Sequence, residues 1–434
     1  MISALQSVQD LLTFIDESPS PWHAVAQIEQ RLHALDFQRL EENQAWHLTS
    51  AGRYYVIRDD SSIVAFVLGD SAFPENGFRI LGAHTDSPGL RIKPNPVLQD
   101  EPLVRLAVEI YGGPILATFT DRDLSIAGRV IFRDENGQLA RQLVNFTQPL
   151  LRLPNLAIHM NRSVNEEGLK LHKQNELALI IADGLDDKGA KTFLPSLLAK
   201  TCQLDAEQLL TWELTVYDTQ KGALWGQDQA FYAHRQLDNL ASCHAGLSAL
   251  LNKTSLNSGN TLVCAFFDHE EIGSESVKGA AGSFLPDTLE RIATAMHLKS
   301  DDYKRMLANS FMISADMAHA YQPNFPNAYD ACHKVFVNRG PVIKINANHR
   351  YASSCVSEAR FIDICQQANI PYQKYNHRGD LPCGSTIGPI ASAKLGIQTV
   401  DIGSPMWAMH SARESAGVLD HGYMISALES FFSH

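Results

Sequence analysis

The chain has 434 residues, of which 45% are hydrophobic and 19% are charged. Because a single hydrophobic core stops growing at roughly 250–300 residues, this length predicts two domains. The formal net charge of −12 argues against nucleic acid as a partner, because a basic surface is the usual footprint of nucleic-acid binding.

The N-terminal segment is expected to form two helices. The first covers about Val8–Ile15, a Ser-Pro-Ser-Pro break follows at 18–21, and the second covers about Trp22–Ala34. Acidic residues interrupt this segment early and no basic region precedes an apolar stretch, so we expect no secretory signal. No apolar run reaches the about 18 residues that a membrane span needs. Seven cysteines without a C-x-x-C motif are typical of reduced thiols, so we expect a cytoplasmic protein without a membrane partner.

Apolar runs then predict strands at Tyr54–Ile57, Ile63–Leu68 and Phe78–Ala83. Between about Arg91 and Asp228 the pattern changes to strand-like pieces separated by turn signals, with few helical patterns. Strands are expected there at Val104–Ile110, Gly128–Phe132, Leu177–Ala182 and Trp212–Tyr217.

After Asp238 the sequence returns to alternating strands and helices. This alternation predicts an α/β sheet with helices on its faces. The sequence therefore predicts one α/β domain, formed by residues 1–91 and 231–434, that is interrupted by a β-rich insertion at 92–230. The expected elements are a helix to about Leu251, strands at Thr261–Phe267 and Phe311–Ser314, a helix at Ser354–Ala368 and a strand at Thr399–Ile402.

Four of these predicted strands run into a histidine or a carboxylate. In open α/β sheets, ligands bind beyond the carboxyl ends of the strands, so these side chains are expected to converge. A further carboxylate, Asp238, opens the helix at 239–251. The strand at 80–83 leads to His84, and the strand at 262–267 leads to Glu270 and Glu271. The strand at 312–314 leads to Asp316, and the strand at 400–402 leads to His410.

Imidazoles and carboxylates without thiolates suit Zn²⁺ or Mn²⁺ in a hydrolytic site. Two such ions need a carboxylate shared between them, and they lower the pKa of bound water to about 7. The adjacent Glu270 and Glu271 allow one carboxylate to bind metal while its neighbour accepts the proton of that water. Asp86, two residues beyond His84, can orient its imidazole.

Each of these residues also has an ordinary structural interpretation. An acidic pair at a strand end is most often a solvated loop, Asp238 alone is a typical helix N-cap, and a histidine such as His410 is usually structural or exposed. Only their shared place at one edge of one sheet favours a metal site.

Other catalytic patterns are weaker. The sequence has neither the H-E-x-x-H motif of single-zinc proteases nor the G-x-S-x-G motif of serine hydrolases. A cysteine nucleophile at Cys243 or Cys383 stays open, although nothing in the sequence places a base beside either thiol. A structural protein without catalysis stays open as well.

The ordered motifs of this chain resemble the M18 family, the aspartyl aminopeptidases. The resemblance extends in order over nearly the whole chain. The motifs are SPSPWHAV at 18–25, GAHTDSP at 82–88, RQLDNL at 235–240, FDHEEIG at 267–273, SADMAHA at 314–320, PCGSTIGP at 382–389 and AMHSARE at 408–414.

The resemblance implies two zinc ions per subunit, with Mn²⁺ or Co²⁺ as substitutes. Asp238 would bind both ions. His84 and Asp316 would complete one site, and Glu271 and His410 the other. The resemblance also implies that Glu270 is the general base and that Asp86 orients His84.

The implied fold is a di-zinc peptidase-like catalytic domain with a mixed sheet between helices, interrupted by a β-rich dimerisation domain. The implied assembly is a homo-oligomer, a tetrahedral dodecamer built from dimers. The implied activity is hydrolysis of N-terminal residues, preferably Asp or Glu, from peptides with a free N-terminus by a zinc-activated hydroxide. A related di-zinc dipeptidase or deacylase would share the metal site.

Three further residues match family positions that contact substrate. His319 and Lys344 are two of them. His159 matches a histidine that reaches the active site of a neighbouring subunit, and a metal-ligand role is the alternative for it.

Overall fold

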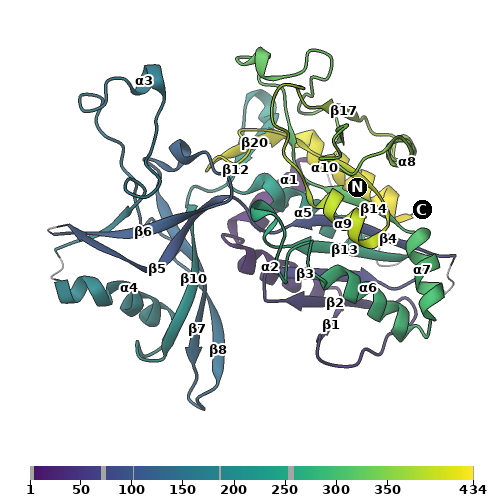
Figure 1. Ribbon diagram of the computed structural model, residues 1–434, viewed down its shortest axis with the longest axis horizontal. Helices are drawn as coiled ribbons and strands as arrows, with labels where there is room; N and C mark the ends of the chain where they lie inside the picture. The colour runs from purple at the N-terminus through teal and green to yellow at the C-terminus, as the bar shows by residue number, and fades with distance from the viewer. Residues whose placement is uncertain (1–3, 70–74, 101, 185–186, 253–258, 434) are drawn as a thin grey trace.

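The computed structural model describes residues 4–69, 75–100, 102–184, 187–252 and 259–433. Within these ranges the chain forms three β-sheets, of nine, six and five strands. Figure 1 shows the nine-stranded sheet and its helices on one side of the molecule and the six-stranded sheet on the other.

The nine-stranded sheet is mixed, with four parallel strands at its centre. In spatial order its strands are β1 (Gln38–Leu40), β2 (Arg53–Arg58), β3 (Ser62–Val67), β13 (Thr261–Phe267), β4 (Phe78–His84), β14 (Phe311–Ala315), β18 (Gln398–Gly403), β16 (Val342–Ile345) and β17 (Gln373–Asn376). The central strands β13, β4, β14 and β18 are parallel and almost entirely buried. Burial on both faces explains why their sequences are continuous apolar runs.

Helices cover both faces of this sheet (Figure 1). One face packs against α1 (Ala4–Asp16), α2 (Pro21–His33), α5 (Leu237–Asn252), α8 (Cys355–Gln367) and α10 (Val418–Ser433). The other packs against α6 (Phe284–Ala295), α7 (Ser300–Ala308) and α9 (Ile387–Leu395). Alternate residues of a strand point to opposite faces, so Leu81 of β4 joins the first core and Ile80 joins the second.

The six-stranded sheet is antiparallel throughout. In spatial order its strands are β8 (Leu139–Asn145), β7 (Leu124–Arg133), β10 (Leu209–Asp218), β5 (Gly89–Asp100), β6 (Leu103–Tyr111) and β9 (Leu179–Asp183). Its core also takes up Leu194 and Leu198 of α4 (Asp187–Cys202), a 16-residue helix that the sequence did not predict. Pro195 lies inside this helix. Because proline usually ends a helix, the sequence pattern around Pro195 does not predict one.

A five-stranded sheet of short strands completes the fold. Its order is β11 (Ala223–Trp225), β12 (Phe231–His234), β20 (Glu414–Gly417), β19 (Pro405–Trp407) and β15 (Ala318–His319). The remaining short elements are η1 (Leu116–Phe119), α3 (Val164–Glu167), η2 (Gln227–Gln229), η3 (Glu270–Ile272) and η4 (Pro326–Ala328).

The predicted α/β fold with a mixed sheet between helices is confirmed. The helix expected from Val8 begins earlier, at Ala4, because Ala4 and Leu5 also pack against the core. The division at residues 91 and 230 stays a prediction, and β5 begins at Gly89, two residues before the first predicted boundary. In the described ranges, no helix is long and apolar enough to cross a membrane.

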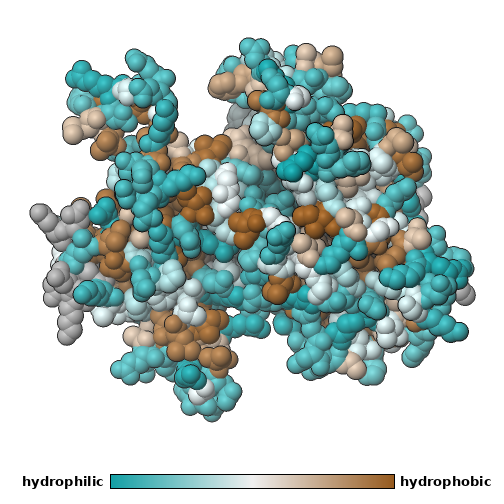
Figure 2. All heavy atoms as spheres, viewed as in Figure 1, coloured by the Kyte–Doolittle hydropathy of each residue, from teal (hydrophilic) through white to brown (hydrophobic). Residues whose placement is uncertain are grey.

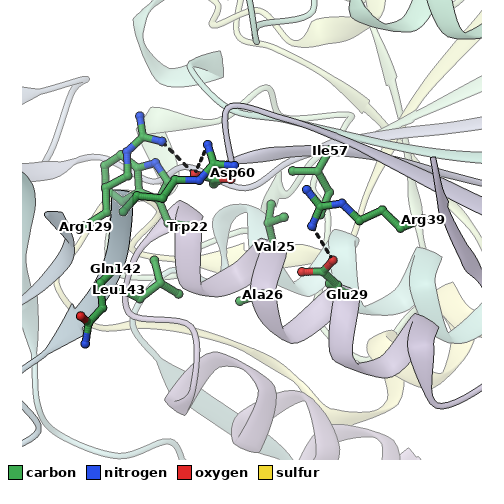
Figure 3. Close-up of a pocket in the computed structure, with 11 residues that line it drawn as sticks. Trp22, Val25, Ala26, Glu29, Arg39, Ile57, Asp60, Arg129, Gln142 and Leu143 are labelled. Atoms are coloured by element: carbon green, nitrogen blue, oxygen red, sulfur yellow. Dashed lines mark hydrogen bonds and ion pairs between the residues drawn. The ribbon is translucent and has the colours of Figure 1, made fainter. Parts of the chain in front are cut away.

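The two larger sheets approach each other where α2 faces β7 and β8. A cavity of about 180 Å³ lies there, lined by Trp22 and Val25 of α2 and by Leu143 of β8 (Figure 3). The guanidinium of Arg129 on β7 lies 5.2 Å from the centre of the Trp22 ring and 3.2 Å from Oδ2 of Asp60. Residues predicted as ligands or catalytic groups do not line this cavity, so it is not the predicted site.

Candidate metal centre

The predicted ligands follow the C-terminal ends of the central strands. His84 is the last residue of β4, and Asp316 directly follows β14. Glu271 lies in η3, just after β13, and His410 lies in the loop after β19. Because β13, β4 and β14 run parallel, their ends meet at one edge of the sheet, as expected from the sequence.

The four other predicted ligands surround Asp238. Its Oδ1 is 3.4 Å from Nε2 of His84, and its Oδ2 is 3.4 Å from Nε2 of His410. Nε2 of His84 is also 3.5 Å from Oδ1 of Asp316, and Nε2 of His410 is 3.5 Å from Oε1 of Glu271. Asp238 therefore belongs to two groups of donor atoms, and the atoms within each group lie within 4.8 Å of one another.

Three buried carboxylate oxygens in this cluster have no hydrogen-bond partner among the described residues. They are Oδ1 of Asp238, Oε1 of Glu271 and Oδ1 of Asp316. A buried oxygen without a partner destabilises the fold, and the neighbouring ring nitrogens lie too far away for good hydrogen bonds. Nitrogen and oxygen donors at this spacing fit two divalent cations such as zinc, with one carboxylate between them.

The electrostatics of the cluster also favour a cation. Burial, with the charge of Asp316 beside it, raises the pKa of Glu270 to about 8. Burial and the charge of Asp238 hold the pKa of Glu271 well above its ordinary value. Burial alone would lower the pKa of His84, but the charge of Glu270 and the other carboxylates hold it well above its ordinary value. Carboxylates crowded in this way are stabilised by a bound cation.

Asp86 holds His84 and the adjacent glutamates in place. Nδ1 of His84 is 3.0 Å from the main-chain oxygen of Asp86 and 3.4 Å from its Oδ1, so the main-chain oxygen is the closer partner of the imidazole. The Asp86 carboxylate accepts hydrogen bonds from the main-chain N–H groups of Glu270 (3.2 Å) and Glu271 (3.1 Å). A His84 that donates from Nδ1 presents the lone pair of Nε2 to a cation.

A buried carboxylate that was not predicted, Glu414, holds the opposite side of the cluster. It accepts hydrogen bonds from the main-chain N–H groups of His410 (2.7 Å) and Asp238 (3.1 Å). Nδ1 of His410 lies 3.1 Å from the main-chain oxygen of Gly113, and Tyr111 donates to Asp86 (2.7 Å), neither of which was predicted. Glu414 is the last residue of the motif at 408–414, so this motif could have indicated its role at the site. The sequence around residues 111–113 contains no motif that indicates a role there.

The predicted ligands and Glu270 line a cavity of about 420 Å³, together with His319 and Lys344. Lys344 is buried, and its Nζ lies 3.2 Å from Oδ2 of Asp316. Burial and the charge of Lys344 lower the pKa of His319 to about 4, so this imidazole is neutral near pH 7. The cavity is therefore large enough for an amino-acid side chain, and the ammonium group of Lys344 lies in its wall.

His159 lies apart from this cavity within a single chain. It is exposed in a turn before α3, and Figure 1 shows α3 beyond the six-stranded sheet, far from β4 and β14. Among the described residues, the groups that could hold a metal do not include His159. The structure thus brings together all predicted site residues except this one.

The two cysteines considered as nucleophiles have different surroundings. Cys243 is fully buried and donates to the main-chain oxygen of His84 (3.0 Å). Burial raises the pKa of Cys243 far above its ordinary value, so it is an inert thiol. Cys383 lines a neighbouring cavity and not the one that holds the predicted ligands.

Comparisons with known sequences identify related proteins. The model of the family described as Aminopeptidase I zinc metalloprotease (M18) matches residues 14–432. A probable M18 family aminopeptidase 2 from Pseudomonas paraeruginosa is 45% identical over 427 residues, which cover 98% of this chain and 97% of that protein. A probable M18 family aminopeptidase 2 from Ectopseudomonas mendocina is 44% identical over 428 residues, which cover 98% of each protein.

Solved structures share the fold. A chain in the cryo-EM structure of the Ape4 and Nbr1 complex matches with a TM-score of 0.96 and 37% identity, covering 99% of this chain and 86% of that chain. A chain of the mApe1 dodecamer from S. cerevisiae matches with a TM-score of 0.87 and 27% identity, covering 98% of this chain and 96% of that chain.

Proposed function

The chain belongs to the M18 family of zinc metallo-aminopeptidases, and on this premise we propose that it removes acidic residues from peptide N-termini with two zinc ions. The proposal adds the two-ion site, the acidic preference and a site shared between subunits to the family activity. The cysteines in the described ranges are free, which supports a reducing compartment such as the cytoplasm.

The observation that carries the two-ion site is the position of Asp238 between two sets of donors. Each of its oxygens faces a different histidine, and one of those oxygens is buried without a hydrogen-bond partner. Zinc prefers nitrogen and oxygen donors in sets of three or four. His84 and Asp316 would complete one site, and Glu271 and His410 the other.

Bound zinc supplies a Lewis acid for the scissile carbonyl and lowers the pKa of the attacking water toward about 7. The protein supplies the proton transfer. Glu270 lines the cavity, so its carboxylate can take a proton from the water and return it to the leaving amine. Its elevated pKa suits a group that accepts and then releases a proton, although a bound cation lowers that pKa.

An activity panel tests the proposed function. Aminoacyl reporter substrates with Asp, Glu, Ala and Leu side chains would be assayed with and without added Zn²⁺, Mn²⁺ and Co²⁺. We expect the acidic reporters to be cleaved fastest, and only in the presence of metal. A preference for Leu would refute the acidic specificity. Cleavage of dipeptides or acylated amino acids alone would favour a di-zinc dipeptidase or deacylase.

Lys344 is the proposed partner of an acidic substrate side chain. It lines the cavity, and a charge-assisted hydrogen bond contributes about 1.5–3 kcal/mol. We therefore expect Lys344→Met to lower kcat/KM for Asp and Glu reporters by about 10–100-fold more than for Ala and Leu reporters. Steady-state kinetics on the same panel measures this difference.

The contact between Lys344 and Asp316 requires a control for metal content. If Lys344 only positions Asp316, the variant would lose zinc and its activity would fall equally on every reporter. Equal losses across the panel would therefore remove Lys344 from substrate recognition. Zinc analysis of the variant separates these two roles.

Assembly is proposed because exposed apolar side chains gather on the part of the chain that forms the six-stranded sheet. Figure 2 shows hydrophobic residues over the ends of β7, β8 and β10, where Leu139 is 69% exposed and Leu210 is 47% exposed. Beside His159, Ile158 is 48% exposed and Met160 is 75% exposed. Such side chains are typical of contacts between subunits, and the proposed assembly is a tetrahedral dodecamer built from dimers.

In this assembly, His159 is proposed to enter the site of a neighbouring subunit and donate to the substrate carbonyl. Losing one such donor typically lowers the rate by ~10²–10³. We expect His159→Ala and Glu270→Gln to be nearly inactive separately and to regain activity when they are dissociated and reassembled together. Some sites of the mixture would then contain both intact residues, one from each subunit.

Native mass spectrometry would verify that the mixed oligomers form. Reassembled His159→Ala alone is the control, because it contains no intact His159. No recovery in verified mixed oligomers would place His159 and Glu270 in the same chain's site and refute the shared arrangement.

A further inference from the structure

The last residue of β6, a strand of the six-stranded sheet, and the two glycines that follow it contact both halves of the metal centre. The residues concerned are Tyr111, Gly112 and Gly113, here called the 111–113 segment. Each of them contacts a different part of the cluster, and none of them is a predicted ligand.

Tyr111 acts on the His84 side through Asp86. Its side chain is buried, and its hydroxyl donates to Oδ2 of Asp86 at 2.7 Å. The same carboxylate faces Nδ1 of His84 and accepts the main-chain N–H groups of Glu270 and Glu271. One phenol therefore fixes the residue whose main-chain oxygen faces Nδ1 of His84 and whose carboxylate holds the main chain of both glutamates.

Gly113 acts on the His410 side through its main-chain carbonyl. Its oxygen lies 3.1 Å from Nδ1 of His410, so it can accept the N–H that leaves Nε2 free for a cation. The next residues hold the same loop, because Ile115 donates to the main-chain oxygen of His410 (2.9 Å) and Ala412 donates to Oγ1 of Thr118 (2.8 Å).

Gly112 packs directly against Glu271. Its φ is +66°, and a Cβ placed on it would lie 3.1 Å from Cβ of Glu271 and 3.2 Å from its main-chain oxygen. Any larger residue at position 112 would therefore be strained and would press on Glu271.

We propose that the 111–113 segment is a positioning element that orients both histidines and Glu271 for zinc, so that zinc affinity depends on how the six-stranded sheet sits against the nine-stranded sheet. This inference rests on the proposed two-zinc site. It gives the β-rich part of the chain a role inside each subunit's own site, separate from any role in assembly.

The first test compares Tyr111→Phe with Tyr217→Phe. Tyr217 is a matched control, because it is equally exposed (7%), lies in the same sheet and has a hydroxyl within hydrogen-bond distance of Oδ1 of Asn145 and the main-chain oxygen of Phe146, away from the site. Calorimetric titration of zinc into the metal-stripped proteins should show affinity for at least one zinc reduced 10–100-fold in Tyr111→Phe. Tyr217→Phe should bind zinc like the wild type, and excess zinc should restore activity to Tyr111→Phe.

The second test compares Gly112→Ala with Gly137→Ala. Both glycines have positive φ (+66° and +76°), but a Cβ on Gly137 would meet nothing within 4 Å. Backbone strain is therefore matched, and only Gly112→Ala should weaken zinc binding. Thermal melting of the metal-free proteins checks that all four variants fold.

The outcomes separate this inference from the proposed function. A wild type that binds two zinc ions while Tyr111→Phe and Gly112→Ala bind them equally well would overturn the positioning role and leave the proposed function standing. A wild type that binds at most one zinc would overturn the two-zinc site and this inference with it.

Discussion

Asp238→Asn is expected to lose both zinc ions together and with them nearly all activity. Each Asp238 oxygen faces a different histidine at 3.4 Å, so one side chain serves both groups of donors. Asparagine keeps the shape but replaces one oxygen by an NH2 group that cannot bind a cation, and it removes the negative charge. Neither remaining set of donors then has a shared carboxylate.

Elemental analysis of the purified variant measures this loss. Asp363→Asn is the control, because it makes the same chemical change at an exposed carboxylate on α8, which accepts a hydrogen bond from the side chain of Gln367 and lies outside the donor groups. The control should keep two zinc ions per chain. A wild type with at most one transition metal per chain, even after reconstitution, would rule out the two-ion model.

Glu270→Gln is expected to lower kcat by ~10²–10⁴ while both zinc ions stay bound. Glutamine preserves the size of the side chain but cannot accept a proton. Glu270 lies 3.9 Å from Nε2 of His84 and forms a further possible donor group with His84 and Glu271, so the zinc content of this variant distinguishes a base from a ligand. Parallel measurement of kcat and zinc content tests both parts of this expectation.

The neighbouring variant Glu271→Gln provides the contrast. Glu271 has a buried oxygen without a partner and lies 3.5 Å from His410, so its amide variant should lose zinc first and activity as a consequence. If Glu270→Gln loses zinc and Glu271→Gln keeps it, the two assignments are reversed.

The convergence of the site could be predicted from the sequence because it follows from topology. His84 and Asp316 each follow an apolar run long enough for a buried strand, and parallel strands bring their C-terminal ends to one edge. His410 was expected at the same edge from the strand at 400–402, although β19 and its loop intervene between β18 and this residue. The family resemblance added the grouping of these residues into two sets of ligands.

The supporting contacts could not be predicted in the same way. Tyr111 reaches Asp86, and Gly113 reaches His410, through pairings between distant positions that leave no periodic pattern in the sequence. A tyrosine at the end of an apolar strand has the same local sequence whether its hydroxyl meets solvent or a buried carboxylate. Only the packing of one sheet against the other decides between these outcomes.

The connectivity of the nine-stranded sheet sets the order in which a nascent chain can become active. All strands of the six-stranded sheet lie between residues 89 and 218, so that sheet can form on the ribosome while β13, β14 and β18 are still unmade. In the proposed metal centre, His84 is synthesised before that sheet and would wait for Asp238, Glu271, Asp316 and finally His410. Peptide hydrolysis by that centre would therefore begin only after nearly the whole chain has been translated, a delay imposed by the path of the backbone itself.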